Sequence, residues 1–159
     1  MQNQYNYTMP IGKITITSFE DKITGVQFGE AKEIYNYEEN AVIKEAARQL
    51  KEYFAGKRKM FDLPLSLEGT KFQVAVWRAL QDIPYGETKS YKEIANSIGN
   101  AKACRAVGMA NNRNKIAIII PCHRVIGTNG ALIGYAGGLD VKEQLLALEK
   151  RERNYRDSL

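Results

Sequence analysis

The sequence predicts an α+β protein with two domains, a small α/β domain over residues 1–68 and a mainly helical domain over residues 69–159. Three observations lead to this prediction. Residues 12–30 alternate apolar and polar side chains, as strands do. Helix-start signatures recur after Gly69, and two short helical segments in that part are separated by a glycine-containing turn. A chain of 159 residues has room for two small domains.

The first domain is expected to contain a hairpin, a helix and a further extended segment. The alternation in GKITITSFEDKITGVQFGE continues on both sides of Glu20-Asp21, which indicates a β-hairpin. The next segment, EENAVIKEAARQLKEYFAG, predicts a helix that Gly56 ends, with one apolar face made by Val42, Ala46, Leu50 and Phe54. KMFDLPLSLEG then predicts a short extended piece, which Pro64 places at a sheet edge.

The second domain is expected to begin with three helices. Thr70 and Gln73 form a capping box before FQVAVWRALQDI, a helix that Ile83-Pro84 ends. Ser90 and Glu93 form a second box before YKEIANSI. Gly99-Asn100 then breaks the chain, and AKACRAVGMA follows as another helix. Two short helices around such a turn predict a helix-turn-helix.

The last part of the chain is expected to be a glycine-rich loop followed by a helix. IAIII, residues 116–120, is typical of a buried strand or core segment, and CHRVIGTNGALIGYAGG follows Pro121 with an Asn-Gly turn. Asp140 and Glu143 form a third capping box before VKEQLLALEKRER, whose predicted apolar face is Val141, Leu145 and Leu148. Glu149 lies four residues after Leu145 and is therefore expected to point inward.

Composition limits the partners and the compartment. Lys and Arg number 23 against 18 Asp and Glu, a formal net charge of +5 that favours a polyanionic partner such as nucleic acid. The longest apolar run is far shorter than the ~20 residues of a membrane span, and the N-terminus lacks the pattern of a secretory signal. With two cysteines and no signal pattern, we expect a cytoplasmic protein with free thiols and no membrane association.

The chain places its only histidine, His123, directly after Cys122. A free thiol is only about 3% thiolate at pH 7, so a nucleophilic cysteine needs a base such as histidine, oriented in turn by a carboxylate. A buried structural cysteine beside an incidental histidine would give the same pair. The spacing of Cys104, Cys122 and His123 matches no zinc motif, so neither a metal nor another cofactor is expected.

IPCHRV, residues 120–125, resembles the active-site signature of the methylated-DNA–protein-cysteine methyltransferases, also called O6-alkylguanine-DNA alkyltransferases. FQVAVWRAL, IPYGETKSYKEIA, KACRAVGMANNRN and GYAGGLDVKEQLLALE also resemble family segments, in the family's order, and together cover most of residues 72–149. The resemblance implies an N-terminal domain similar to ribonuclease H and a winged-helix-like C-terminal domain. It also implies repair of DNA by transfer of an alkyl group to the protein's own cysteine, once per chain.

The resemblance assigns catalytic roles to five residues of this sequence. Cys122 would accept the alkyl group, His123 would act as base through a water, and Glu149 would orient the histidine. Asn114 would brace the thiol and its loop. Tyr91 would lie beside the flipped base and donate a proton to the leaving guanine.

The resemblance also implies a DNA-binding surface and a base pocket. Arg105 would enter the stack that the flipped base vacates, a minor-groove mode in which small residues let the helix approach. The other residues expected at the DNA are Asn100, Lys102 and Ala103. The pocket for the alkylated base is expected from four residues, Val125, Tyr135, Ala136 and Gly137. The partner would be double-stranded DNA bearing O6-alkylguanine, with O4-alkylthymine as a further substrate that the sequence does not decide, and the protein would be a monomer.

This sequence departs from the family pattern at identifiable positions. No Cys or His precedes Cys104, so the zinc site of some members has no counterpart. Lys115 stands where a proline is expected, and Ala136 stands where some relatives carry serine.

Three other functions remain open from the sequence. An alkyltransferase-like lesion binder would share the fold but replace the acceptor cysteine, typically by tryptophan, and Cys122 argues against it. A helix-turn-helix regulator would need no Cys-His-Glu set and would be expected to carry base-reading polar residues where this helix has alanines. A thiol hydrolase would need an acyl pocket, which no segment suggests.

Overall fold

The computed structural model describes residues 2–31, 36–130, 134–135 and 137–157, with side chains as far as residue 151. The chain separates into two compact units, residues 1–67 and residues 68–159. Each unit is described by itself. Among the described residues, no helix is both long and apolar enough to cross a membrane.

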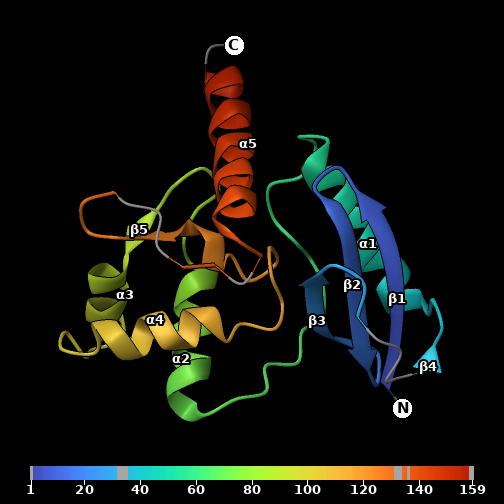
Figure 1. Ribbon diagram of the computed structural model, residues 1–159, viewed down its shortest axis with the longest axis horizontal. Coiled ribbons are helices and arrows are strands. Elements are labelled where there is room, and N and C mark those ends of the chain that lie inside the picture. The colour runs from blue at the N-terminus through green and yellow to red at the C-terminus, as the bar shows by residue number, and fades with distance from the viewer. Residues whose placement is uncertain (1, 32–35, 131–133, 136, 158–159) are drawn as a thin grey trace. The chain divides into compact units, whose positions relative to one another are not determined.

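The described residues of unit 1 form a four-stranded sheet and one helix (Figure 1). The strand order is β3-β2-β1-β4, with β1 (Gln2–Met9), β2 (Gly12–Phe19) and β3 (Lys22–Phe28) antiparallel and the short β4 (Asn36–Tyr37) parallel to β1. The β2–β3 hairpin turns at Glu20 and Asp21, both with positive φ, as the sequence predicted. β1 and β4 were not predicted. The sequence of β1 does not show the alternation of a strand, because most of its residues are polar. Even Gln4, a polar residue, is buried at 1% exposure.

Helix α1 (Ala41–Phe54) packs on this sheet and begins at Asn40, whose side chain accepts a hydrogen bond from the Ile43 backbone N–H. Ala46 and Leu50 are buried as predicted, but Val42 and Phe54 are only half-buried. The buried face of α1 is made instead by Ile43, Ala46, Ala47, Leu50 and Tyr53. The sheet contributes the buried side chains Ile14, Ile16 and Val26 to the same core. The predicted extended segment is present, and Leu65 forms a parallel bridge with Ile23 beside β3.

Unit 2 is mainly helical, as predicted. Helices α2 (Lys71–Gln81), α3 (Tyr91–Ser97) and α4 (Cys104–Asn112) pack together, and α5 (Leu139–Asp157) packs against the single turn η1 (Cys122–Arg124) (Figure 1). The short strands β5 (Lys89–Ser90) and β6 (Val125–Ile126) pair in parallel. The indole N–H of Trp77 donates to the Ala110 carbonyl at 2.8 Å and thereby ties α2 to α4.

Local signals fix the start of two helices and misplace the start of two others. The capping boxes Thr70/Gln73 and Ser90/Glu93 are both formed. The third predicted box is wrong, because α5 begins at Leu139 and so places Asp140 inside its first turn. The second helix of the helix-turn-helix begins at Cys104, so residues 101–103 belong to the turn. Without a capping side chain at Ala103, the sequence carries no clear start signal there.

The segment Ile116–Ile120 is a buried run of turns that leads into the η1 turn. The sequence indicated a buried strand or core segment, and it is the second of these. Ile118 has φ +70°, an uncommon conformation for a β-branched residue, so neighbouring contacts must hold it. Asn114 provides them: its amide donates to the Ile120 carbonyl at 2.8 Å and its oxygen accepts from the Ile116 N–H at 3.0 Å.

Candidate active site

The thiol and the imidazole lie in a buried turn. Cys122 is 4% exposed and His123 is fully buried, and the turn is closed by the Arg124 N–H, which donates to the Pro121 carbonyl at 3.0 Å. Asn111 at the end of α4 donates to the Cys122 carbonyl at 3.3 Å. The turn is thus held by Asn114 before it and by α4 beside it, so the thiol has a fixed position.

His123 and Glu149 form a close pair between η1 and α5. Nε2 of His123 lies 2.6 Å from Oε2 of Glu149, and both side chains are at most 1% exposed. A carboxylate can only accept, so Nε2 carries a proton, and in a neutral imidazole Nδ1 is then the nitrogen with the lone pair. Among the described residues, Nδ1 of His123 has no hydrogen-bond partner. The inward position expected for Glu149 is therefore the observed one.

In the resting site, the surroundings favour the uncharged forms of the Cys122 thiol and the His123 imidazole. Burial lowers the pKa of His123 below its ordinary value of 6.5, although Glu149 opposes this. Burial also raises the pKa of the Cys122 thiol above 9.0, while Asn114, Tyr135 and Lys142 act in the opposite direction. At neutral pH the resting site therefore holds a thiol and a neutral imidazole, so the thiol proton must be removed during reaction rather than beforehand.

Glu149 stays ionised through its partners. Burial by itself would raise the pKa of this carboxyl, but His123 and Arg124 outweigh it and hold the pKa well below the ordinary value of 4.5. Arg124 donates from Nε to Oε1 at 2.8 Å and from Nη2 to Oε2 at 3.1 Å, and the backbone N–H of Gly86 reaches Oε1 at 3.3 Å. The carboxylate is thus an anion with both oxygens in use.

Arg124 and Lys142 are site residues that the sequence reasoning did not identify. Lys142 is fully buried on α5, and its Nζ donates to the Val125 carbonyl at 2.5 Å. Its charge lowers the thiol pKa of Cys122. The spacing held a usable signal: Lys142 and Glu149 lie three residues before and four after the buried Leu145, on one helix face. Val141, which was predicted for that face, is only half-buried.

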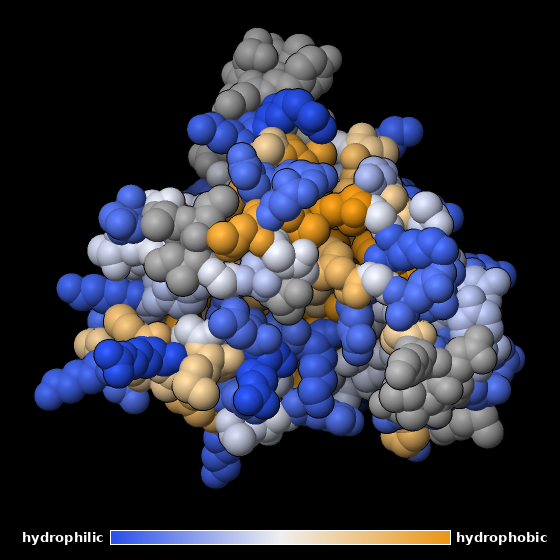
Figure 2. All heavy atoms as spheres, viewed as in Figure 1, coloured by the Kyte–Doolittle hydropathy of each residue, from blue (hydrophilic) through white to orange (hydrophobic). Residues whose placement is uncertain are grey.

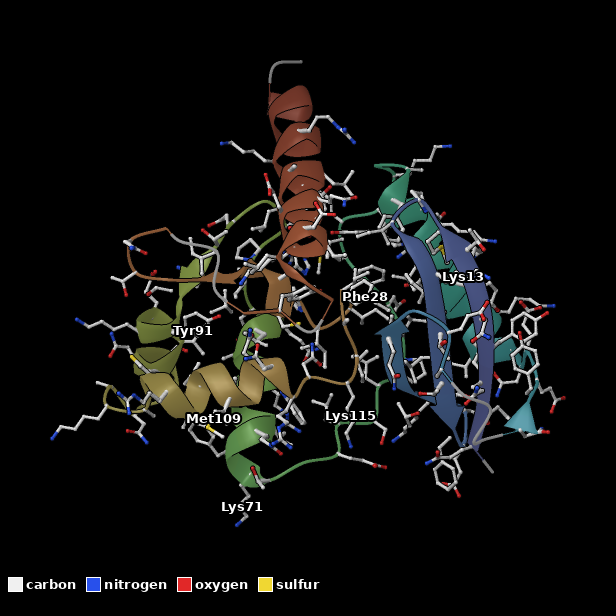
Figure 3. All side chains as sticks on the ribbon, in the orientation of Figure 1. Lys13, Phe28, Lys71, Tyr91, Met109 and Lys115 are labelled. Atoms are coloured by element: carbon white, nitrogen blue, oxygen red, sulfur yellow. The ribbon has the colours of Figure 1, made fainter. Side chains whose placement is uncertain are left out.

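Two tyrosines lie near the thiol. Tyr91 projects from the start of α3 toward α4 (Figure 3), where its ring would lie 3.8 Å from a Cβ added at Gly108. Burial raises the pKa of Tyr91, and the charge of a Cys122 thiolate raises it further. The pKa of Tyr135 is raised by the same two causes in the same order. Both phenols are therefore protonated at neutral pH, and both lie close enough to Cys122 for a charge on its sulfur to raise their pKa.

The other predicted pocket residues fall at different places. Val125 is fully buried, and its carbonyl is held by Lys142. Tyr135 and Gly137 are half-buried. Ala136 lies outside the described residues.

The predicted DNA-binding residues share one exposed surface around the start of α4. Asn100, Lys102 and Arg105 are exposed and Ala103 is half-buried. Figure 2 shows hydrophilic side chains projecting on the side of the molecule where α3 and α4 lie. Met109, 64% exposed and directed outward from α4 (Figure 3), is an apolar exception among the small residues of this helix.

No group of three His, Cys, Asp or Glu side chains within the described part of the chain is placed to hold a metal ion. Both cysteines are free thiols, Cys104 half-buried and Cys122 buried. The fold and site therefore define a protein that joins a helix-turn-helix to a buried thiol, imidazole and carboxylate.

Comparison with known proteins identifies this combination. The family models of the 6-O-methylguanine DNA methyltransferase ribonuclease-like domain and DNA-binding domain match residues 5–67 and 71–151. This chain belongs to the methylated-DNA–protein-cysteine methyltransferase family. The Methanosarcina acetivorans member is 55% identical over 148 residues, which cover 90% of this chain and 95% of that protein. The constitutive enzyme of Bacillus subtilis is 49% identical over 150 residues, covering 89% and 91%.

A solved structure agrees over the same length. The crystal structure of Mycobacterium tuberculosis OGT in complex with DNA is 45% identical and superposes with a TM-score of 0.89, covering 94% of each chain. The prediction of an α+β fold with a ribonuclease-like domain followed by a helical DNA-binding domain is confirmed.

Proposed function

We propose that this chain repairs double-stranded DNA by moving the alkyl group of O6-alkylguanine onto Sγ of its own Cys122. The observation that carries the proposal is the buried turn in which Cys122 precedes His123: Nε2 of His123 lies 2.6 Å from the Glu149 carboxylate, and its Nδ1 has no hydrogen-bond partner among the described residues. A lesion binder or a transcription regulator has no use for this arrangement.

The chemistry begins with a thiol and a neutral imidazole. Nδ1 of His123 accepts the thiol proton, through a water, as Sγ attacks the alkyl carbon. The imidazolium that forms is stabilised by Glu149, with which it shares a hydrogen bond. The bond between the alkyl carbon and guanine O6 breaks, and its electron pair stays with the guanine.

The leaving guanine must gain a proton. Tyr91 is protonated at neutral pH, because burial and the sulfur charge both raise its pKa, and it donates this proton as the guanine leaves. The proton held on His123 then restores the phenol through solvent. Overall, one S–H bond and one C–O bond are replaced by one S–C bond and one N–H bond on guanine.

DNA binding is assigned to the surface around α4. Extruding the base costs a few kcal/mol of stacking, which Arg105 offsets by filling the vacated space. The exposed Lys102 and Asn100 contact the backbone, and the protein acts as a monomer. Phosphate contacts dominate, so the log of the association constant falls with log salt by about 0.9 per neutralised phosphate.

Peptide mapping after reaction with an O6-methylguanine duplex tests this assignment. Cys122→Ala is expected to abolish transfer while leaving DNA affinity within a few-fold, because the thiol acts on the lesion and α4 does the binding. Cys104→Ala is the matched control and is expected to retain transfer, since Cys104 lies at the start of α4. Methyl found on Cys104 instead would overturn the assignment.

A further inference from the structure

Arg124 is a buried cation that the alkyl-transfer steps above do not use. It is 6% exposed, and its guanidinium binds both oxygens of Glu149, from Nε at 2.8 Å and from Nη2 at 3.1 Å. The remaining nitrogen, Nη1, donates to the Ile83 carbonyl at 2.8 Å, and the group lies 5.7 Å from the centre of the Tyr85 ring. The guanidinium is thus fixed by contacts on three sides.

The carboxylate of Glu149 favours a protonated imidazole, which could not act as a base. A buried carboxylate 2.6 Å from an imidazole favours the imidazolium, because opposite charges stabilise one another strongly where water is excluded. An imidazolium carries protons on both nitrogens. It therefore has no lone pair at Nδ1 with which to accept the proton of the Cys122 thiol.

Arg124 balances the charge of this carboxylate. A bidentate guanidinium–carboxylate pair has no net charge, so the imidazole beside it gains a hydrogen-bond acceptor without a full negative charge. Oε2 of Glu149 receives both His123 Nε2 and Arg124 Nη2, so the balancing charge acts at the same oxygen that holds the imidazole.

We propose that Arg124 is a positioning residue that keeps His123 a neutral imidazole with its proton on Nε2, and that it does so by binding and neutralising Glu149. The role of this neutral imidazole as the base for Cys122 rests on the proposed function. The state of His123 itself does not, and it can be measured without any alkyl transfer.

Most of the surroundings of His123 favour the neutral imidazole. Burial is the largest cause of its lowered pKa, the charges of Arg124 and Lys142 lower it further, and Glu149 raises it. The other titratable groups near the thiol and the imidazole are Cys122 itself, Tyr135 from the loop before α5 and Tyr91 from the start of α3. Tyr85, from the segment after α2, lies against the Arg124 guanidinium. Tyr91 and Tyr135 have raised pKa values and are uncharged at neutral pH, so the positive charge near His123 comes from Arg124 and Lys142.

Nitrogen-15 NMR of imidazole-labelled protein tests the proposal with one signal set, because His123 is the only histidine of the chain. The wild-type protein at pH 7 is expected to show a neutral ring with the proton on Nε2. Arg124→Gln removes the balancing charge and is expected to raise the titration midpoint of His123 by about 1–3 pH units, the usual effect of an adjacent opposite charge. Arg124→Lys keeps a charge and is expected to leave the ring neutral at pH 7.

The double variant Arg124→Gln, Glu149→Gln separates charge from packing. It removes both charges together, so His123 is expected to be neutral again at pH 7, even though the guanidinium is still missing. The matched control is Arg48→Gln on α1, which breaks an exposed pair with Glu45 and Glu52 and is expected to leave the signals of His123 unchanged.

An imidazolium in the wild-type protein at pH 7, or an unchanged midpoint in Arg124→Gln, would overturn the proposal. If Arg124→Gln fails to fold, the wild-type tautomer and Arg124→Lys still decide it, since protonation at pH 7 in either one contradicts a charge-balancing role. If the NMR results are as expected but the pH dependence of alkyl transfer is the same in Arg124→Gln as in wild type, the inference stands and the proposed role of His123 as base fails.

Discussion

Arginine–glutamate pairs occur in both units of this protein, in opposite surroundings. In unit 1, Arg48 binds Glu45 and Glu52 along α1, with the side chains of Arg48 and Glu45 54% and 41% exposed. In unit 2, Arg124 binds Glu149 with exposures of 7% and 1%. The chemical groups are the same. Water screens the first pair and is excluded from the second, so only the second can control the charge of a neighbouring imidazole.

The difference shows how burial turns a common contact into a functional one. An exposed ion pair contributes about 0–1 kcal/mol, whereas removing one partner of a buried pair leaves an uncompensated charge that costs about 3–5 kcal/mol. A buried pair adds little net stability over apolar packing, so its presence beside a thiol and an imidazole indicates a role in the chemistry.

Glu149→Ala is expected to have the largest effect. It leaves Arg124 buried without its carboxylate and His123 without its acceptor, so the free energy of unfolding should fall by about 3–5 kcal/mol. Urea denaturation measures this loss. Glu149→Gln keeps the size and an acceptor, and transfer from free O6-benzylguanine should still be slowed. Wild-type rates in Glu149→Gln would break the contrast between the two pairs, because the buried carboxylate would then have no chemical role.

The pH dependence of stability tests the same site from both sides. The folded-state pKa values of His123 and Glu149 lie below their ordinary 6.5 and 4.5, so each contributes stability above those values that is lost as pH falls. The folded-state pKa of Cys122 lies above 9.0, so its contribution is present below pH 9.0 and is lost as pH rises further.

Thermal unfolding midpoints from pH 5 to pH 10 should therefore be highest between about pH 6.5 and pH 9. Cys122→Ala should remove the alkaline decline and keep the acid one. An alkaline decline that persists in this variant would show that another group causes it.

Arg105→Ala tests an arginine that is exposed and is still expected to contribute to repair, through contact with DNA. Repair of duplex DNA should slow by about tenfold or more relative to reaction with free O6-benzylguanine, since each ~1.4 kcal/mol of uncompensated unstacking costs a factor of ten. Arg78→Ala, at an exposed position in the last turn of α2, is the control and should change neither rate. Equal losses on both substrates for Arg105→Ala would assign it to the fold or the pocket.

Arg48→Ala is expected to have the smallest effect. Its ion pairs on α1 are exposed, so the free energy of unfolding should change very little and alkyl transfer should not change. Urea denaturation in low and high salt measures the contribution. A loss as large as that of Glu149→Ala would mean that exposure does not separate the two pairs.

Sequence reasoning worked where the signal was local. The Thr70 and Ser90 capping boxes, the Glu20-Asp21 turn and the inward position of Glu149 each depend on residues within four positions of one another. The family resemblance supplied the site, and the structure pairs His123, from the turn that also holds Cys122, with Glu149.

The remaining features depend on contacts between distant segments. Strand β1 is mostly polar and forms because β2 pairs with it along its whole length. Lys142 resembles any exposed helix lysine until α5 packs on η1 and buries it. Ile118, with its positive φ, lies between Ile116 and Ile120, which the Asn114 side chain binds. Arg124 lay inside the recognised signature, but its contact with Glu149 joins residues 25 positions apart.

We expect Cys122 to accept the alkyl group and to be consumed by the reaction. Alkyl transfer leaves a thioether, which has no acidic proton for His123 to remove and is a poor leaving group, so no group described at this site can regenerate the thiol. Titrating a known amount of active protein with excess O6-methylguanine duplex tests this most directly. The expected result is a plateau at one methyl group per chain, located on Cys122. Product that continues to form beyond one equivalent would contradict it.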